Sequence, residues 1–279
     1  TRDDLPPFGP GFQAARSRFE QQREAGARSM IARMYDVGLR PLNAARAELG
    51  LAPLAHTLEQ LRAANLIMLG TSDRFDFGQD PPPAPFAYAG PLGEAPSWAA
   101  KATPDLITSG VPNVLVSFST TYQGQEKAIA RTIRAMADLP VAGIVTLGPA
   151  LRPEQVGSAS NVKVVESASH DTLIPHCAAV VCHGGHGTVL RPLMHGVPVI
   201  CMPMGRDHAD NAARIAARGA GLRLSRDAGP VAIRKALTRL LASPSYRDAA
   251  SSWGAEIART ADAGLAAAES FEKLALNAA

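Results

Sequence analysis

Residues 178–188 read Ala178-Ala179-Val180-Val181-Cys182-His183-Gly184-Gly185-His186-Gly187-Thr188. The apolar first part is typical of a buried strand, and a helix-like run from Val189 to His195 follows the glycines. Residues 196–201, Gly-Val-Pro-Val-Ile-Cys, then repeat the buried-strand pattern. The glycine cluster is therefore predicted to form a strand-to-helix turn in a βαβ unit. At such a turn the backbone N–H groups of a helix N-terminus can hold an anion.

Strand-like and helix-like segments alternate on both sides of this turn. Buried-strand patterns occur at residues 114–118, 141–147, 162–165 and 222–224, and helix-like segments separate them. This alternation predicts an α/β fold with a parallel, doubly wound sheet, in which ligands bind beyond the carboxyl ends of the strands. The motifs at 117–120, 167–171, 183–188 and 206–208 each follow a predicted strand. We therefore expect them to converge on one edge of the sheet.

The domain organisation follows from a proline-rich segment at residues 80–85 and from Gly90-Pro91 shortly after it. Such a segment is typical of a linker, and it predicts one domain at 1–92 and a second at 93–279. Residues 12–49 are predicted to be helical with an interruption at Arg40-Pro41. The chain is predicted to end in three helices: 231–242, 245–253 and 254–276.

The composition excludes several classes of protein. The chain has 279 residues, 46% of them hydrophobic, and a formal net charge of +3. Its basic residues are scattered without aromatic interleaving, which argues against nucleic-acid binding. No apolar run approaches the roughly 20 residues that span a bilayer. The three cysteines lie in apolar surroundings, which predicts buried free thiols and a cytoplasmic protein.

The residues of the glycine turn suit the binding of a phosphate group. Glycines at 184, 185 and 187 let a ligand approach the backbone, and His183 can donate a ring N–H to a phosphate oxygen. Thr188 can donate its hydroxyl and can also cap the following helix. Three alternatives stay open: a purely structural βα turn, a zinc pair His183-x-x-His186, and a Cys182–His183 nucleophile. The zinc pair lacks a third ligand at a suitable spacing.

Two neighbouring motifs each allow two interpretations. Asp207 follows a predicted strand, so its carboxylate can accept two hydroxyl hydrogen bonds, but local chemistry favours a plain helix N-cap there. The hydroxyl residues at 117–121 suit a phosphate site, but by themselves they favour an ordinary Ser/Thr turn.

Taken together, the order of the motifs resembles the C-terminal domain of GT-B-fold glycosyltransferases that use UDP- or TDP-activated sugars. The resemblance rests on His183-Gly-Gly-x-Gly-Thr188, Gly196-Val197-Pro198, Pro203-x-x-x-Asp207, Asn211-Ala212 and Gly219-x-Gly221. It extends over about residues 66–265, and it is greatest for bacterial enzymes that modify small natural products.

The resemblance implies a role for each motif. The diphosphate is expected at His183, Gly184, Gly185, Gly187, Thr188 and Thr120. The base is expected at Ala168 and His170, and the donor sugar at Asp207 and His208. No metal and no cofactor are implied. The sequence departs from common family residues at Ser167, where many relatives have an aromatic, at Arg191, where several have glutamate, and at His208, a frequent glutamine.

The resemblance also concerns what the chain lacks. The family's catalytic histidine base lies near the start of the N-terminal domain, which has no counterpart here, and His56 stands in the wrong context. We therefore expect an N-terminally incomplete chain whose catalytic base lies elsewhere. Residues 1–92 would be the C-terminal part of the acceptor-binding domain. Residues 93–279 would form the donor-binding domain, whose final helix returns to the N-terminal domain.

The implied activity is inverting, metal-independent sugar transfer from a nucleotide-diphosphate sugar to a hydroxyl of a small acceptor. The expected partners are that donor, that acceptor, and either the missing N-terminal half or a second copy of the chain. The alternatives are a non-catalytic donor-binding subunit that needs a partner chain and a nucleotide-sugar epimerase of the same fold. A glycoside phosphorylase is disfavoured because no lysine lies in a suitable glycine-rich loop.

Overall fold

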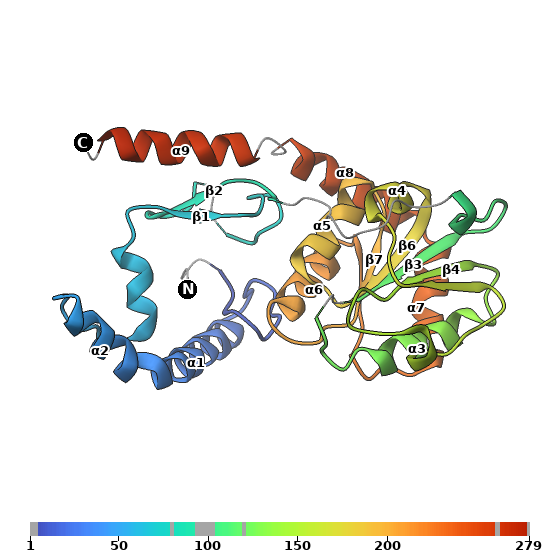
Figure 1. The fold of residues 1–279 in the computed structure, drawn as a ribbon, viewed down its shortest axis with the longest axis horizontal. Helices are drawn as coiled ribbons and strands as arrows, with labels where there is room; N and C mark the ends of the chain where they lie inside the picture. Colours follow the sequence, from blue (N-terminus) through green and yellow to red (C-terminus); the bar gives the residue numbers. More distant parts are fainter. Residues whose placement is uncertain (1–4, 79–80, 93–103, 119–120, 260–262, 278–279) are drawn as a thin grey trace. The chain divides into compact units, whose positions relative to one another are not determined.

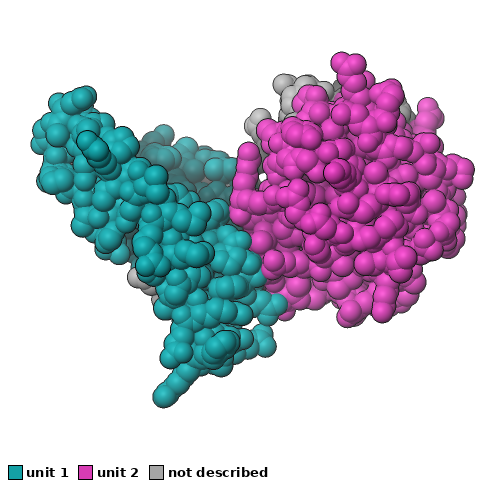
Figure 2. Space-filling view, turned by 90° about the horizontal axis from the view of Figure 1, so that it is seen from below, with its two compact units in different colours: residues 1–92, 260–279 teal, residues 93–259 magenta. Residues whose placement is uncertain are grey.

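The computed structural model describes residues 5–78, 81–92, 104–118, 121–259 and 263–277. The chain divides into two compact units, which Figure 2 distinguishes by colour. Unit 1 comprises residues 1–92 and 260–279, and unit 2 comprises residues 93–259. Within the described ranges, no helix combines the length and apolar character needed to cross a membrane.

Unit 2 is built on a six-stranded sheet. Its strands are β3 (Asn113–Ser117), β4 (Ala142–Thr146), β5 (Val162–Val165), β6 (Cys177–Cys182), β7 (Val199–Cys201) and β8 (Gly221–Arg223). They lie in the order β5-β4-β3-β6-β7-β8, and every neighbouring pair is parallel. The chain thus builds outward from β3, crosses back to β6, and builds outward again. The predicted doubly wound parallel sheet is confirmed.

Helices cover both faces of this sheet (Figure 1). The α-helices of unit 2 are α3 (Glu126–Met136), α4 (His170–Leu173), α5 (His186–Met194), α6 (His208–Ala217), α7 (Pro230–Ala242) and α8 (Pro244–Ala258). The short 3-10 helices are η3 (Pro104–Leu106), η4 (Pro153–Gln155) and η5 (Ile174–His176). Helices α3 and α7 pack against each other, and α5 packs against α6 and α8.

The core follows from strand alternation. Val114 and Val116 of β3 belong to the apolar cluster that contains buried residues of α3 and α7, whereas the equally buried Leu115 between them does not. Successive side chains of a strand point to opposite faces. Both faces of the central strand are therefore buried, which explains why the three middle residues of β3 are all apolar.

Unit 1 is mostly helical. Its elements are α1 (Arg18–Tyr35), η1 (Asp36–Gly38), α2 (Leu39–Glu48), η2 (Thr57–Ala63), β1 (Ile67–Leu69), β2 (Phe86–Tyr88) and α9 (Ala263–Asn277). Strands β1 and β2 pair in parallel. The predicted interruption at Arg40-Pro41 is wrong, because the helix breaks at η1 instead. Pro41 lies in the first turn of α2, where its missing N–H costs no helical hydrogen bond.

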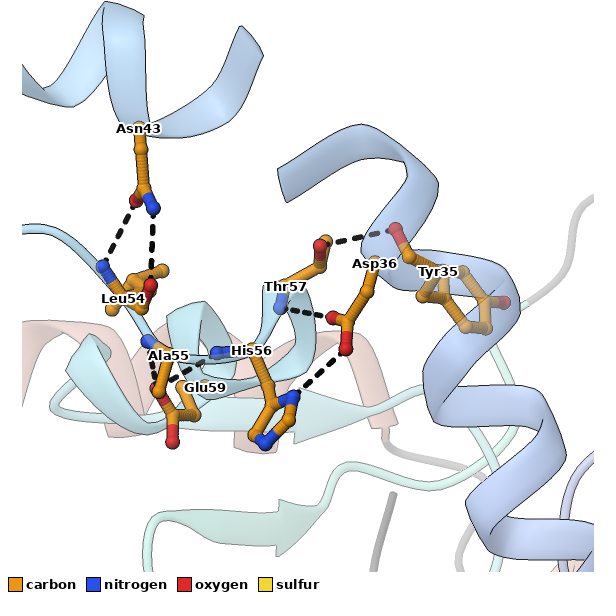
Figure 3. A network of polar contacts seen from close by, with 8 residues as sticks. All are labelled: Tyr35, Asp36, Asn43, Leu54, Ala55, His56, Thr57 and Glu59. Carbon is orange, nitrogen blue, oxygen red and sulfur yellow. Dashed lines mark hydrogen bonds and ion pairs between the residues drawn. The ribbon is translucent and has the colours of Figure 1, made fainter. Parts of the chain in front are cut away.

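A polar network holds the segment before η2 against the corner between α1 and α2 (Figure 3). His56 Nδ1 lies 2.8 Å from Asp36 Oδ2, and the Thr57 amide donates to Asp36 Oδ1 at 2.8 Å. The Asn43 amide donates to the Leu54 carbonyl and accepts from the Leu54 N–H. The hydrogen bond to Asp36 raises the pKa of His56, and the same bond lowers the pKa of Asp36. His56 therefore has a structural contact here: its bond to Asp36 holds the segment before η2 against the corner between α1 and α2.

Two predicted helix boundaries are wrong. Helix α5 begins at His186 instead of Val189, so the last glycine of the turn already lies in its first turn. Gly254 lies inside α8 and does not start the last helix, which is α9. A Cβ atom on Gly254 would lie 1.8 Å from the Leu193 carbonyl oxygen at the end of α5. This glycine therefore permits close contact between two helices and is no helix breaker.

Candidate functional site

A cavity of about 420 Å³ lies at the carboxyl edge of the unit 2 sheet. Ser117 ends β3, Thr146 ends β4, His183 follows β6, and all three line the cavity together with Asp207, which follows β7. Since β3 and β6 are neighbours from which the chain builds outward in opposite directions, the cavity lies at the switch point of the topology. This is where doubly wound sheets bind ligands.

The structure brings most of the expected site residues together in this one cavity. Its wall contains Ala168, His170, His183, Gly185, Gly187, Thr188, Asp207 and His208. Gly184 belongs to the same turn without contributing to the wall. Thr120 lies outside the described residues.

The turn between β6 and α5 has a backbone that requires glycine at one point. Gly184 has φ +90°, and a Cβ atom there would lie 2.9 Å from the His208 carbonyl oxygen. Gly185 is the N-cap of α5, and the Thr188 and Val189 amides both donate to its carbonyl. The predicted capping by Thr188 is therefore wrong, because Thr188 is the third residue of the helix. The N-terminus of α5 lines the cavity, and it carries the partial positive charge of the helix dipole.

His183 lies at the centre of the wall and is 7% exposed. Burial, and next the charge of the nearby His208, lower its pKa to about 4. The ring is therefore neutral at pH 7 and can serve as a hydrogen-bond donor through one nitrogen. It packs edge-on against the His208 ring with 4.5 Å between the centroids.

Asp207 and His208 stand at the start of α6. His208 Nδ1 accepts a hydrogen bond from the Met204 amide at 3.2 Å, so the neutral ring carries its proton on Nε2. Asp207 occupies the N-cap position, but its carboxylate accepts no backbone N–H there. It accepts the Asn211 side-chain amide at 2.8 Å instead. The simple N-cap interpretation is therefore wrong, and the carboxylate lies in the cavity wall.

Another part of the wall contains a further histidine, the half-buried His170. His170 Nε2 lies 3.0 Å from Thr146 Oγ1, and burial, with a smaller effect of Arg191, lowers the pKa of His170 to about 4. The Arg191 Nε lies 3.5 Å from Asp171 Oδ1. This end of the cavity thus combines a neutral imidazole with a guanidinium whose charge is partly balanced.

The cysteine next to His183 has a structural environment. Cys182 is fully buried, and its Sγ accepts the Gly184 amide at 3.3 Å. A hydrogen bond between the Cys201 thiol and Cys182, and then burial, raise the pKa of Cys201 on the neighbouring strand. These contacts do not support a Cys182–His183 nucleophile. In the described part of the chain, no three His, Cys, Asp or Glu side chains are grouped to hold a metal ion.

Arg206 and Thr146 had no individual role in the sequence prediction, although Arg206 belongs to the motif 206–208 that was expected at this edge. Arg206 lines the cavity with φ 53°, a left-handed conformation that is uncommon outside glycine and often marks a functional site. Thr146 supports His170 from the end of β4. A hydroxyl at the end of a buried strand was a usable signal for Thr146, whereas only its place in the motif 206–208 distinguishes Arg206 from other arginines in the sequence.

The comparisons with known proteins agree with this geometry. Residues 130–265 match the family model described as "Erythromycin biosynthesis protein CIII-like, C-terminal domain". The chain is 31% identical over 190 residues to the 4'-demethylrebeccamycin synthase of Lentzea aerocolonigenes, covering 67% of this chain and 45% of that protein. It is 32% identical over 181 residues to the TDP-daunosamine transferase DnrS of Streptomyces peucetius, covering 62% and 41%. The chain thus spans less than half the length of these relatives.

The fold has solved counterparts as well. The crystal structure of CalG4, the calicheamicin glycosyltransferase, superimposes with a TM-score of 0.70 at 24% identity, covering 95% of this chain and 66% of that one. At this identity the likeness shows the fold alone. The chain therefore has the GT-B fold, residues 130–265 are similar to the erythromycin biosynthesis protein CIII-like C-terminal domain, and the chain is similar in sequence to glycosyltransferases of natural-product biosynthesis.

Proposed function

We propose that the protein transfers a sugar from a nucleoside-diphosphate sugar to a hydroxyl of a small, natural-product-like acceptor, with inversion and without a metal ion. One observation carries this proposal: an anion-binding helix N-terminus and the Asp207 carboxylate line the same cavity. A nucleotide-sugar needs both, since its diphosphate is an anion and its sugar presents hydroxyl groups that a carboxylate accepts.

Each end of the cavity has a role in this proposal. The diphosphate binds His183, Thr188 and the amides of Gly184, Gly185 and Gly187. The nucleobase lies near Ala168 and His170, and the donor sugar near Asp207 and His208. The name of one relative, the TDP-daunosamine transferase DnrS, supports a donor of this class.

The chemistry of transfer fits these residues. The acceptor oxygen attacks the anomeric carbon from the side opposite the leaving group, so one C–O bond forms while the bond to the diphosphate breaks. The departing diphosphate gains negative charge. Helix amides and the neutral His183 N–H stabilise that charge by hydrogen bonds in a partly dry site.

The proposal divides the remaining tasks between the units. Residues 93–279 carry the donor site, and residues 1–92 contribute to acceptor binding, with the final helix on the acceptor side. The base that deprotonates the acceptor is left unassigned, and a second copy of the chain or further polypeptide is the candidate to complete the acceptor site. We place the protein in the cytoplasm, a compartment that suits its three buried free thiols.

The decisive experiment is calorimetric titration of the chain with UDP and with TDP in the presence of EDTA. The wild type is compared with His183→Ala, and Asn161→Ala serves as a matched control. The Asn161 amide binds the carbonyls of Met136, Leu139 and Val141 and does not line the cavity.

Binding that survives EDTA, falls about tenfold or more in His183→Ala and persists in Asn161→Ala supports the proposal. Absence of binding by the wild type for both nucleotides contradicts donor binding by this chain. Binding that EDTA abolishes contradicts the metal-independent mechanism.

A further inference from the structure

Asn211 lies in the first turn of α6, and its side-chain amide joins two parts of the cavity wall. Its Nδ2 donates to the Gly184 carbonyl at 2.9 Å and to Asp207 Oδ2 at 2.8 Å. The residue is 4% exposed, so solvent competes little for these bonds. One buried side chain therefore connects the turn between β6 and α5 with the Asp207 carboxylate.

The chemistry of the amide fixes this arrangement. A backbone carbonyl and a carboxylate are both pure acceptors, so the NH₂ end of Asn211 must face them. That group has two hydrogens, and each acceptor takes one. Rotation of the Asn211 side chain by a half-turn would place its oxygen against two acceptors. The hydrogen-bonding partners thus leave one orientation.

The hydrogen bond from Asn211 also fixes the orientation of the Asp207 carboxylate. Asn211 holds Oδ2, while Oδ1 lies 4.0 Å from His208 Nε2. The Asp207 side chain is 39% exposed and lines the cavity. Because Oδ2 is held, Oδ1 is the oxygen available for a ligand hydroxyl.

The hydrogen bond from Asn211 to Gly184 likewise holds the turn between β6 and α5 close to α6. The site where Gly184 would carry a Cβ lies 2.9 Å from the His208 carbonyl, so the turn already lies against the first residue of the helix. The bond from Asn211 to the Gly184 carbonyl holds it there. A shift of the turn would therefore pull on the same amide that orients Asp207.

We propose that Asn211 is a positioning residue that couples the diphosphate turn to Asp207, so that the two halves of a nucleotide-sugar reinforce each other's binding. The inference rests on the proposed function. It predicts that Asn211 contributes to binding of the sugar through Asp207, beyond any contribution to the stability of α6.

The test is a double-mutant cycle read with two probes, UDP-glucose and UDP, and repeated with TDP-glucose and TDP. The variants are Asn211→Ala, Asp207→Ala and the double variant, with Asn161→Ala as the control, since the half-buried Asn161 amide also donates to backbone carbonyls elsewhere in unit 2. Asn211→Asp preserves the side-chain volume without donating hydrogen bonds while ionised, and it takes the place of Asn211→Ala if that variant fails to fold.

Coupling predicts that Asn211→Ala weakens the nucleotide-sugar about tenfold and the free nucleotide less than about threefold. In the Asp207→Ala background, removal of Asn211 should cost little more. Asn161→Ala should leave the ratio of the two affinities unchanged. Equal losses for both probes, or losses that add fully in the double variant, would overturn the inference.

A ligand-free measurement separates this inference from the proposed function. Hydrogen exchange at the amides of residues 183–188 is compared between the wild type and Asp207→Ala. Coupling predicts faster exchange in the turn when the Asp207 carboxylate is removed, since the Asn211 amide then loses one of its two hydrogen-bond acceptors. Unchanged exchange overturns the coupling, whereas failure of the wild type to bind any nucleotide or nucleotide-sugar overturns the proposed function alone.

Discussion

A Cβ atom on Gly185 would lie 2.4 Å from Nε2 of His183. The backbone of Gly185 has φ −62°, which any residue adopts, so the requirement for glycine comes from the imidazole alone. Gly185→Ala should therefore displace the His183 ring without straining the turn. We expect nucleotide affinity to fall about tenfold or more, which calorimetric titration with UDP and TDP measures.

Gly229→Ala is the matched control for that substitution. Its Cβ position has no heavy atom within 4 Å, and Gly229 is the N-cap of α7 and does not line the cavity. We expect unchanged nucleotide affinity in this variant. An equal loss of affinity in both variants would show that displacement of the His183 ring is not the cause of the loss.

Gly254→Ala should destabilise unit 2. The added methyl would overlap the Leu193 carbonyl oxygen at 1.8 Å, and backbone cannot rotate away as a flexible side chain can. Overpacking of this kind costs about 1–3 kcal/mol, which urea unfolding measures. Gly26→Ala in α1 is the control, since its Cβ position is open and the change should be stabilising by up to about 1 kcal/mol. Equal stability of the two variants would contradict the close packing of α8 on α5.

His183 should make stability depend on pH. Its pKa is about 4 in the folded protein against an ordinary 6.5, so between these values the unfolded chain binds a proton that the native protein does not. Its contribution is therefore full above pH 6.5 and is lost as pH falls toward 4, by about 3 kcal/mol in total. Urea unfolding between pH 7 and 4 should show a shallower decline for His183→Asn than for the wild type. Parallel curves would rule out this contribution.

His56 should titrate above its ordinary value of 6.5 because Asp36 favours the imidazolium. The stabilisation by this pair is present below pH 6.5 and is lost as pH rises through the raised pKa of His56. On the acid side it is lost below 3.8, as pH falls through the lowered pKa of Asp36. An NMR titration of the His56 ring should show the raised value in the wild type and a return toward 6.5 in Asp36→Asn. The substituted side chain can still accept the Thr57 amide.

The thiols should not react in the folded protein. Cys177, Cys182 and Cys201 are buried, and burial raises the pKa of Cys177 to about 12. We expect iodoacetamide to label all three only in denaturant, because the thiolate is the reactive form. Cys182→Ala should keep nucleotide affinity within about threefold, since its Sγ serves the turn through one weak hydrogen bond. Loss of nucleotide binding in Cys182→Ala would indicate that the Cys182 thiol has a direct role in the site.

The sheet was predictable from the sequence because its central strands are buried on both faces. An apolar run such as Val114-Leu115-Val116 admits few other structures, and alternation with helices then favours parallel pairing. The boundaries near glycine were not predictable in this way. Gly254 signals a break in sequence, but tertiary contact with Leu193 decides that it is helical.

The members of the site were predictable where they follow a strand in a recognisable motif. His183 and Asp207 belong to motifs whose position after a strand already indicates the ligand edge. Asn211 was visible in the motif pattern, but its two hydrogen bonds join residues that only the folded domain brings together. Arg206 is unusual through its backbone conformation, which composition does not reveal.

Strands β3 and β6 pair at the centre of the sheet, with Ser117 opposite Cys182, although the two strands are far apart along the chain. Closing such a loop costs entropy before any contact rewards it, so this pairing is expected late in folding. The cavity depends on it, because its walls come from both halves of the domain. A partly folded unit 2 in which β3 and β6 are not paired therefore has no cavity. A nucleotide that binds only the complete cavity would stabilise the native sheet by mass action.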